Sequence, residues 1–161
     1  MKIGILSDIH GNRFALEAVL REARARSVEK LFLLGDQVGY YYAPDEVMSM
    51  LDGWQYELIQ GNHEGMLKQA FLQGRVPEDV EQRYGRGLRM ALEKLDGNRV
   101  RTLTEAPERK LLSVDGVGCL LCHGAPWDRD TYIYPDAARA VLDRCACADA
   151  LSSVGPSVRS V

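Results

Sequence analysis

Four apolar runs along this sequence each end near a glycine and a polar side chain that can bind a metal ion. The runs cover residues 2–6, 31–34, 56–60 and 117–122. Short apolar runs that stop at a polar break are typical of buried strands, and open α/β sheets bind ligands at the carboxyl ends of their parallel strands. The pattern therefore predicts a sheet whose chemistry lies at the ends of its strands.

Helical periodicity separates the first three runs. The apolar positions of the first predicted helix are Leu16, Val19, Leu20 and Ala23. Asn12 is suited to cap this helix, and Pro44 is suited to be the first residue of the next one. Because strand, helix and strand in succession form a βαβ unit, we expect Asp36 to lie beside Asp8 at one edge of the sheet.

The second half of the chain is predicted to add further helices and a hairpin. Helical spacing over residues 77–95 predicts one helix, which Gly85 and Gly87 weaken in its middle and which Gly97 ends. A short helical segment follows around Val100.

The hairpin is predicted from Asp115-Gly116, which separates residues 110–114 from the run at 117–122. A two-residue Asp-Gly connection is a strong hairpin signal. The second strand of this hairpin ends at His123.

The composition indicates a single domain without a strongly charged surface. The chain has 161 residues, with Lys+Arg 20 against Asp+Glu 23 and a net charge of -3, so it lacks the basic field of duplex-binding proteins. No run approaches membrane-spanning length, and residues 1–6 are too short for the core of a signal peptide, so we expect a cytoplasmic protein without a membrane partner. If the substrate is anionic, bound cations must supply the attraction.

The residues after the first run can bring two different donors to one cation. Asp8 and His10 are two positions apart, so in extended backbone their side chains would leave on the same face, and Gly11 allows a sharp turn behind them. Asn62 offers a neutral carbonyl oxygen for a second cation, and its alternative role is a helix cap. A lone Asp after a strand is more often a turn former or cap, but capping alone does not explain four such runs together.

Four motifs occur in order along the chain. They are Asp8-x-His10, Gly35-Asp36 with Gly39, Gly61-Asn62-His63-Glu64 and His123-Gly124-Ala125-Pro126. Jointly the motifs resemble those of the calcineurin-like metallophosphoesterase family, with the small bacterial phosphodiesterases as the nearest branch. The resemblance implies an α/β fold, a two-layer mixed β sandwich flanked by helices, shortened at its C-terminus. We expect this domain over residues 1–145 and an atypical tail over 146–161.

The resemblance also implies two divalent metal ions, with Mn²⁺, Fe²⁺, Ni²⁺ and Zn²⁺ as the candidates. Asp8 and His10 would hold the first ion, Asp36 would bridge both, and Asn62 and His123 would hold the second. His63 would be catalytic, since in the family this histidine contacts the phosphate and is implicated in protonating the leaving oxygen. Two cations about 3.5 to 4 Å apart can bind a phosphate oxygen and lower the pKa of a water that attacks phosphorus in line.

The chain departs from the family near its C-terminal end. Members carry a Gly-His-x-His segment that gives each metal one further ligand, whereas the three histidines of this chain are all used above. Gly155 can be the glycine of that segment, with Pro156 and Val158 in place of the imidazoles. Cys147 or Asp149 would substitute only if the tail folds inward. We therefore expect weaker metal binding.

The same departure has consequences for the second sheet. Without its last strands the sheet would have an open edge and uncovered apolar surface, and pairing of two subunits along that edge as a homodimer would cover it. From Leu151 onward the sequence is alternatively a disordered tail or the product of a shifted reading frame. The protein sequence leaves these alternatives open.

The leading functional hypothesis is a divalent-metal-dependent phosphoesterase that hydrolyses phosphomono- or phosphodiester bonds of a small phosphate ester or nucleotide, with impaired activity. The alternative is a non-catalytic relic of the fold that serves as a binding or interaction module. The missing histidine pair favours the relic, and the retention of His63 beside Asn62 favours the enzyme. Residues 40–42 and 127–134 are expected to form the pocket wall that selects the substrate.

Overall fold

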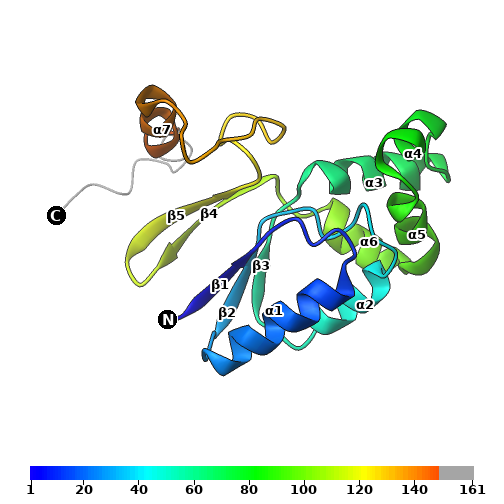
Figure 1. Cartoon of the computed structure of the whole chain (residues 1–161), viewed down its shortest axis with the longest axis horizontal. Coiled ribbons are helices and arrows are strands. Elements are labelled where there is room, and N and C mark those ends of the chain that lie inside the picture. Colours follow the sequence, from blue (N-terminus) through cyan, green and yellow to red (C-terminus); the bar gives the residue numbers. More distant parts are fainter. Residues whose placement is uncertain (149–161) are drawn as a thin grey trace.

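The structure, a computed structural model, describes residues 1–148 (Figure 1). Its N-terminal half is a three-stranded parallel sheet in the order β1-β2-β3, with Ile3 opposite Lys30 and Leu31 opposite Tyr56. The strands are β1 (Ile3–Leu6), β2 (Lys30–Leu33) and β3 (Tyr56–Leu58), and the connecting helices are α1 (Arg13–Ala25) and α2 (Pro44–Leu51). The predicted βαβ arrangement is confirmed, with Asn12 as the cap of α1 and Pro44 as the first residue of α2.

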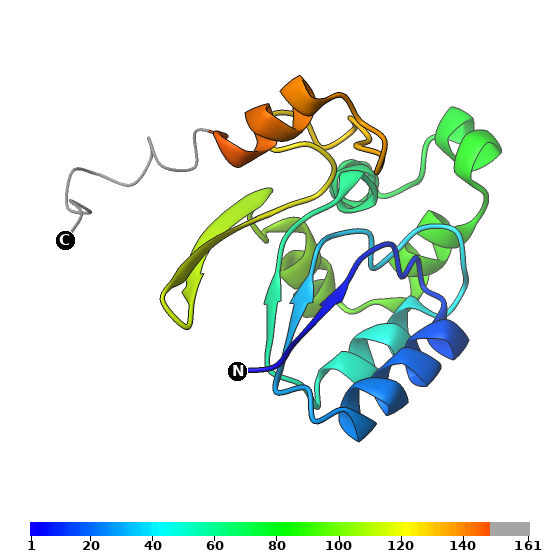
Figure 2. The same ribbon diagram turned by 60° about the vertical axis from the view of Figure 1, so that its left-hand side comes forward.

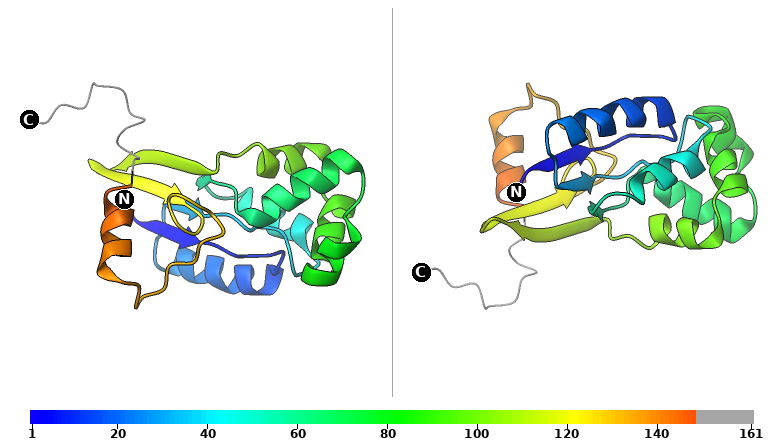
Figure 3. Two further views of the ribbon diagram at one scale, coloured as in Figure 1. Left: turned by 90° about the horizontal axis from the view of Figure 1, so that it is seen from above. Right: turned by 90° about the horizontal axis from the view of Figure 1, so that it is seen from below.

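Helices cover one face of this sheet. Besides α1 and α2, they are α3 (Asn62–Gln73), α5 (Gly87–Lys94) and α6 (Gly97–Thr104). Apolar side chains of all five helices join Leu31 and Leu33 of β2 in the larger core, in which Leu31 is fully buried. The two views of Figure 3 show the helices gathered beside the sheet. Burial of this apolar surface is the main term that stabilises the fold.

A hairpin of β4 (Arg109–Val114) and β5 (Val117–Cys122) lies against the opposite face of the sheet. Figure 2 shows it standing on the side away from α1 and α2. A second, smaller core forms there from Phe32, Ile59 and Leu121, with Leu112 packed against it. Two packed layers with flanking helices confirm the predicted fold class.

The hairpin turn also agrees with its prediction. Asp115 and Gly116 both have positive φ, 50° and 84°. Left-handed backbone at both central positions is the turn geometry that matches the twist of paired strands, and Asp-Gly supplies it at low cost. His123 follows β5 directly, so the hairpin carries it to the parallel sheet.

The prediction of a single helix over residues 77–95 is wrong. The segment is divided into α4 (Glu78–Tyr84) and α5 at Gly85, whose φ is +74°. Gly87 opens α5 in contact with another loop, because a Cβ at Gly87 would lie 1.2 Å from the carbonyl oxygen of Gly39. Gly97 does not end a helix either: it is the first residue of α6, which Asp96 caps. Gly85 thus supplies the left-handed backbone at the break, and Gly87 allows the close approach of the loop that contains Gly39.

The outer edge of β1 has no paired strand within residues 1–148. Ile5 is 67% exposed although its neighbours in the strand pack into the two cores, because the hairpin does not reach over it. The open edge was expected in the second sheet, which within residues 1–148 consists of β4 and β5 alone. Pairing of two subunits along that edge stays a prediction. An open strand edge can template pairing with another chain.

The last described helix, α7 (Arg139–Ala146), contacts the loop that follows His123. The guanidinium of Arg144 lies 3.8 Å from the ring centroid of Trp127. The predictions about Asp149, Gly155, Pro156, Val158 and the sequence from Leu151 onward lie outside the described residues. Among the helices of residues 1–148, none combines the length and the apolar character needed to cross a membrane.

Candidate metal centre

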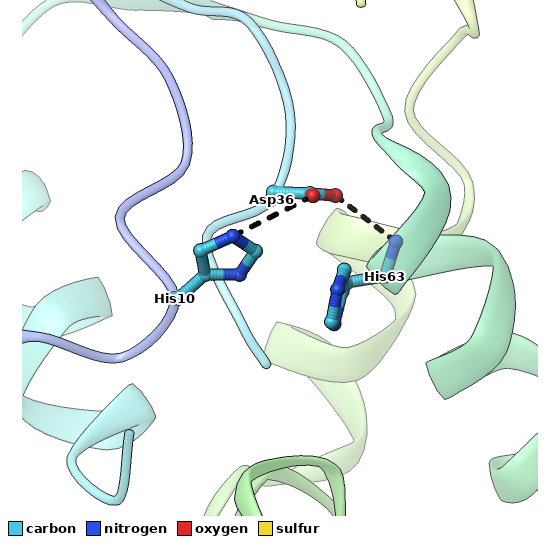
Figure 4. Close-up of side chains that lie close together, drawn as sticks. All are labelled: His10, Asp36 and His63. Carbon is cyan, nitrogen blue, oxygen red and sulfur yellow. Dashed lines mark hydrogen bonds and ion pairs between the residues drawn. The ribbon is translucent and has the colours of Figure 1, made fainter. Parts of the chain in front are cut away.

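Asp36 lies at the centre of a cluster of imidazole and carboxylate groups. It follows β2 and is 2% exposed. Its Oδ2 lies 3.8 Å from His10 Nε2 and 3.5 Å from His123 Nε2. Figure 4 shows His10 and His63 on either side of the carboxylate. Donor atoms in two overlapping groups, His10–Asp36–His63 and Asp8–Asp36–His123, lie within 4.8 Å of one another, a spacing at which each group can share one ion.

Both predicted histidine ligands are oriented by backbone carbonyls. His10 Nδ1 lies 3.0 Å from the carbonyl oxygen of Val38, and His123 Nδ1 lies 2.7 Å from that of Leu34. A carbonyl can only accept, so each Nδ1 carries the proton and each Nε2 presents a lone pair toward Asp36. This is the arrangement that fixes the tautomer of metal-binding histidines in proteins.

The backbone at these positions differs from the extended conformation that the sequence suggested. Asp8, His10 and Asp36 all have left-handed φ values, 58°, 52° and 59°. The expected meeting of Asp8 and His10 still occurs, with Asp8 Oδ1 3.6 Å from His10 Nε2, but a tight turn produces it, and alternation along a strand does not. Non-glycine residues in this region carry strain and gather at functional sites. Gly11, at φ 75°, continues the turn.

Three glycines let the loops approach the cluster closely. A Cβ at Gly61 would lie 2.1 Å from Asp36 Oδ1, and a Cβ at Gly35 would lie 2.4 Å from the backbone nitrogen of Gly61. A Cβ at Gly39 would meet His10 Nδ1 at 2.5 Å and His63 Nδ1 at 2.6 Å. The glycines of the motifs are thus required by space next to the candidate ligands.

Glu64 is the residue whose role the sequence did not reveal. It is fully buried in the first turn of α3 and accepts four backbone N–H groups. Its Oε2 accepts from Asp36 (2.7 Å) and Gly61 (2.8 Å), and its Oε1 accepts from Gln37 (2.8 Å) and Val38 (3.4 Å). Glu64 therefore ties the loop after β2 to the loop before α3. The bond to Gly61, three residues earlier, is the back-bonded half of a capping box, a signal that could have identified this role.

Asn62 and His63 occupy the first two positions of α3. Gly61 is the N-cap, so the alternative role of Asn62 as the cap is wrong; Asn62 is half-buried and lines a neighbouring cleft. The backbone N–H of His63 donates to Asp36 Oδ1 (2.9 Å). The His63 imidazole is 2% exposed, and its ring centroid lies 4.6 Å from that of His10.

Two tyrosines enclose the His63 imidazole. The ring centroids of Tyr40 and Tyr84 lie 5.0 Å and 5.3 Å from that of His63, and Tyr40 also contacts His10 edge-on at 4.7 Å. Tyr40 belongs to the expected aromatic wall over residues 40–42, whereas Tyr84 comes from α4 and was not predicted. Aromatic edges and faces in this geometry restrict how the imidazoles can turn.

Burial changes the protonation of the central groups. Burial raises the pKa of Asp36 to about 6, against the hydrogen bond from His63 N–H. Burial, followed by the charge of His10, lowers the pKa of His63 to about 4, so its imidazole is neutral at pH 7. Burial and then the Asp36 charge raise the pKa of Glu64 to about 7, opposed by the backbone N–H groups that it accepts. Two nearby acids with raised pKa values beside the neutral imidazole of His63 make an environment that a cation would stabilise.

The structure thus brings five of the six predicted site residues into one cluster: Asp8, His10, Asp36, His63 and His123. Asn62 stands beside it at the start of α3. The donor types fit divalent transition-metal ions, which imidazole and carboxylate ligands suit. The assignment of individual residues to individual ions stays a prediction.

The fold and this cluster agree with a family comparison. The model of the calcineurin-like phosphoesterase superfamily domain matches residues 1–155, and the chain belongs to this superfamily. The family as a whole binds divalent metals, in keeping with the donor set around Asp36.

Individual proteins similar to the chain are longer than it is. The uncharacterized protein MJ0912 of Methanocaldococcus jannaschii is 30% identical over 141 residues, which is 83% of this chain and 54% of the relative. A metallophosphoesterase from Sphaerobacter thermophilus is 30% identical with a TM-score of 0.62, over 83% of this chain and 51% of that one. Hypothetical protein PH1004 from Pyrococcus horikoshii OT3 shares the fold at 21% identity, with a TM-score of 0.69 over 89% and 63% of the two chains. The chain thus spans between half and two thirds of their length.

Proposed function

We propose that this protein is a metal-dependent phosphoesterase that hydrolyses phosphomono- or phosphodiester bonds with two divalent cations. The observation that carries the proposal is the surroundings of Asp36: one buried carboxylate oxygen faces the Nε2 atoms of His10 and His123, and the other accepts the His63 N–H. A carboxylate shared in this way offers oxygen to two ions at once. Family membership supports the same reaction class.

The residues present fit such a pair of ions. Asp8, His10 and Asp36 would hold one, and Asp36, His123 and the carbonyl of Asn62 the other. When bound, the cations would draw phosphate oxygens to the site and acidify the attacking water. Water adds to phosphorus, the bond from phosphorus to the leaving alcohol breaks, and the proton lost by water passes to the leaving oxygen or to solvent.

His63 is the proposed catalytic residue. Its neutral imidazole can donate an N–H to a phosphate oxygen at pH 7. An anionic substrate beside His63 would raise its pKa and favour the protonated imidazole, which can donate a proton to the leaving oxygen. Tyr40 and Tyr84 hold the ring and keep bulk water from its faces. Glu64 keeps the two ligand-bearing loops in register.

A non-catalytic binding module is the second candidate. The observation that favours it is the small number of nitrogen donors, since the sequence has three histidines and all lie in the one cluster. With few nitrogen donors for two ions, we expect weak metal binding and reduced turnover. The presence of His63, buried between Tyr40 and Tyr84, favours the enzyme. A module that only binds has no use for a group that can protonate a leaving oxygen.

Hydrolysis of p-nitrophenyl phosphate and bis(p-nitrophenyl) phosphate with added Mn²⁺, Ni²⁺ or Zn²⁺ tests the proposal. We expect Asp36→Ala to lower the rate by at least about 100-fold, since even outer-shell partners of a metal site contribute 10–100-fold. The matched control is Asp136→Ala, an exposed aspartate on the loop before α7, which should keep the wild-type rate. Equal rates for wild type and Asp36→Ala would exclude the enzyme and leave the binding module.

A further inference from the structure

An open cleft of about 490 Å³ adjoins the metal centre. Small-molecule sites in proteins have volumes of roughly 300–1,000 Å³, so this cleft holds far more than a phosphate group. Asn62, Gln69 and Tyr84 line it together with Lys68 and Arg129, and its exposed lining is mainly polar. The cleft thus offers two side-chain amides, an aromatic ring and two positively charged side chains.

Three residues of the lining connect the cleft to the cluster around Asp36. Asn62 precedes His63, whose N–H binds Asp36. Tyr84 presents its ring to the His63 imidazole at 5.3 Å between centroids. Arg129 is close enough to Asp36 to lower its pKa, and it also lines a smaller pocket with His123. A group bound in the cleft would therefore lie next to a phosphate at the metal centre.

Arg129 is held between this cleft and the metal centre by two contacts. Its Nη1 donates to Glu108 Oε1 at 3.0 Å. Its guanidinium also lies against Gly65 in the first turn of α3, where a Cβ would come within 2.8 Å of Nη2. Glycine inside a helix costs about 1 kcal/mol relative to alanine, and a methyl group at position 65 would require the Arg129 guanidinium to shift. An arginine fixed in this way is pre-organised to donate to phosphate oxygens.

We infer that the cleft is the subsite for the second ester group of a phosphodiester, and that this group is of nucleoside size. The inference rests on the proposed function, since it places the phosphate at the metal centre. The charges of Lys68 and Arg129 are balanced in the lining by Glu108 and Asp130, so the cleft suits a neutral, polar, ring-bearing group such as a nucleoside. Arg129, at the junction, binds a non-bridging oxygen of the phosphate.

Two substrates with the same scissile bond and leaving group test the subsite. Thymidine 5′-(p-nitrophenyl phosphate) and ethyl p-nitrophenyl phosphate both release p-nitrophenol and differ only in the group that the cleft would hold. We expect the wild type to favour the thymidine ester by at least about tenfold in kcat/KM, the scale of discrimination by pocket contacts. Gln69→Trp fills the cleft from an exposed position on α3 and should abolish that preference, because kcat/KM falls mainly for the thymidine ester.

Gln73→Trp, an exposed position on the same helix that does not line the cleft, is the matched control and should behave as wild type. Arg129→Gln and Gly65→Ala should lower kcat/KM for both esters, whereas Arg21→Gln, exposed on α1, should lower neither. Equal use of the two esters by the wild type, or an equal loss on both in Gln69→Trp, would overturn the subsite while leaving the phosphoesterase intact.

If neither ester is hydrolysed faster than by Asp36→Ala, the proposed function fails and binding decides the subsite. Calorimetry with thymidine 5′-monophosphate and the Mn²⁺-treated chain then supplies the measurement. Weaker binding to Gln69→Trp than to the wild type and to Gln73→Trp would support the cleft. Equal affinity in all three proteins, or no binding to the wild type, would overturn it.

Discussion

Replacing Glu64 by glutamine should destabilise the protein and loosen its metal site. The side chains have nearly the same shape, but the amide replaces one acceptor oxygen by an NH₂ group that can only donate. Whichever way the amide turns, its NH₂ faces two backbone N–H groups, either those of Asp36 and Gly61 or those of Gln37 and Val38. Two buried donors are then left without an acceptor.

The magnitude follows from the cost of an unsatisfied buried donor, about 1–3 kcal/mol each. Two such donors give a loss of about 2–6 kcal/mol, reduced by the removal of a buried charge, so we expect about 2–4 kcal/mol. Urea denaturation at about pH 8.5, above the pKa of about 7 that burial gives Glu64, measures this loss in the free energy of unfolding. Titration with Mn²⁺ should in addition show weaker binding, because the loops that carry Asp36 and His63 are no longer tied together.

Glu17→Gln is the matched control, since Glu17 is exposed on α1. Surface changes of this kind usually stay within about 0.5 kcal/mol. If Glu64→Gln also stays within that range, Glu64 does not hold the loops. The role assigned to its four hydrogen bonds would then be refuted.

Three further outcomes are expected. Gly61→Ala should abolish Mn²⁺ binding, because its Cβ would lie 2.1 Å from Asp36 Oδ1, whereas Ala91→Gly in the buried face of α5 should weaken folding but keep the metal; calorimetry on the folded proteins separates the two effects. Hydrogen bonds from Lys110 and then Lys30 lower the pKa of Glu57. The stability that Glu57 contributes is therefore present above pH 4.5 and is lost as the pH falls through the lowered pKa of the folded state. We expect the difference in unfolding free energy between wild type and Glu57→Gln to decrease over the same fall in pH. Two copies paired along the open edge of β1 should give a dimer in sedimentation that Ile5→Lys dissociates, and a monomer at all concentrations would count against pairing.

Much of the fold could be predicted because its signals are local. Apolar runs with polar ends marked the strands, and Asp115-Gly116 marked the hairpin turn. The division of residues 77–95 could not be predicted with the same security, since it depends on the approach of Gly87 to Gly39, two positions far apart in sequence. Helical spacing continues across the break, so periodicity alone favours one helix there.

The candidate site shows the same difference between local and distant causes. The residues that meet at Asp36 each belong to a short motif beside a strand end. They are histidines and aspartates, residue types that commonly bind metal ions. Tyr84 reaches the site through packing between elements, which no spacing in the sequence records. Arg129 lies in the segment 127–134 that was expected to form the pocket wall, but its approach to Gly65 depends on tertiary packing. The left-handed backbone at Asp8 and His10 was missed because extended backbone also brings residues two apart together.

The contact between Gly87 and Gly39 limits how this protein can change. Any side chain at position 87 would displace the Gly39 carbonyl and, with it, the peptide that precedes Tyr40. Tyr40 borders both His10 and His63, so the disturbance would spread to the imidazoles. Position 87 carries no functional group and lies nearly fifty residues downstream of that loop. A substitution there would nevertheless disturb the metal centre.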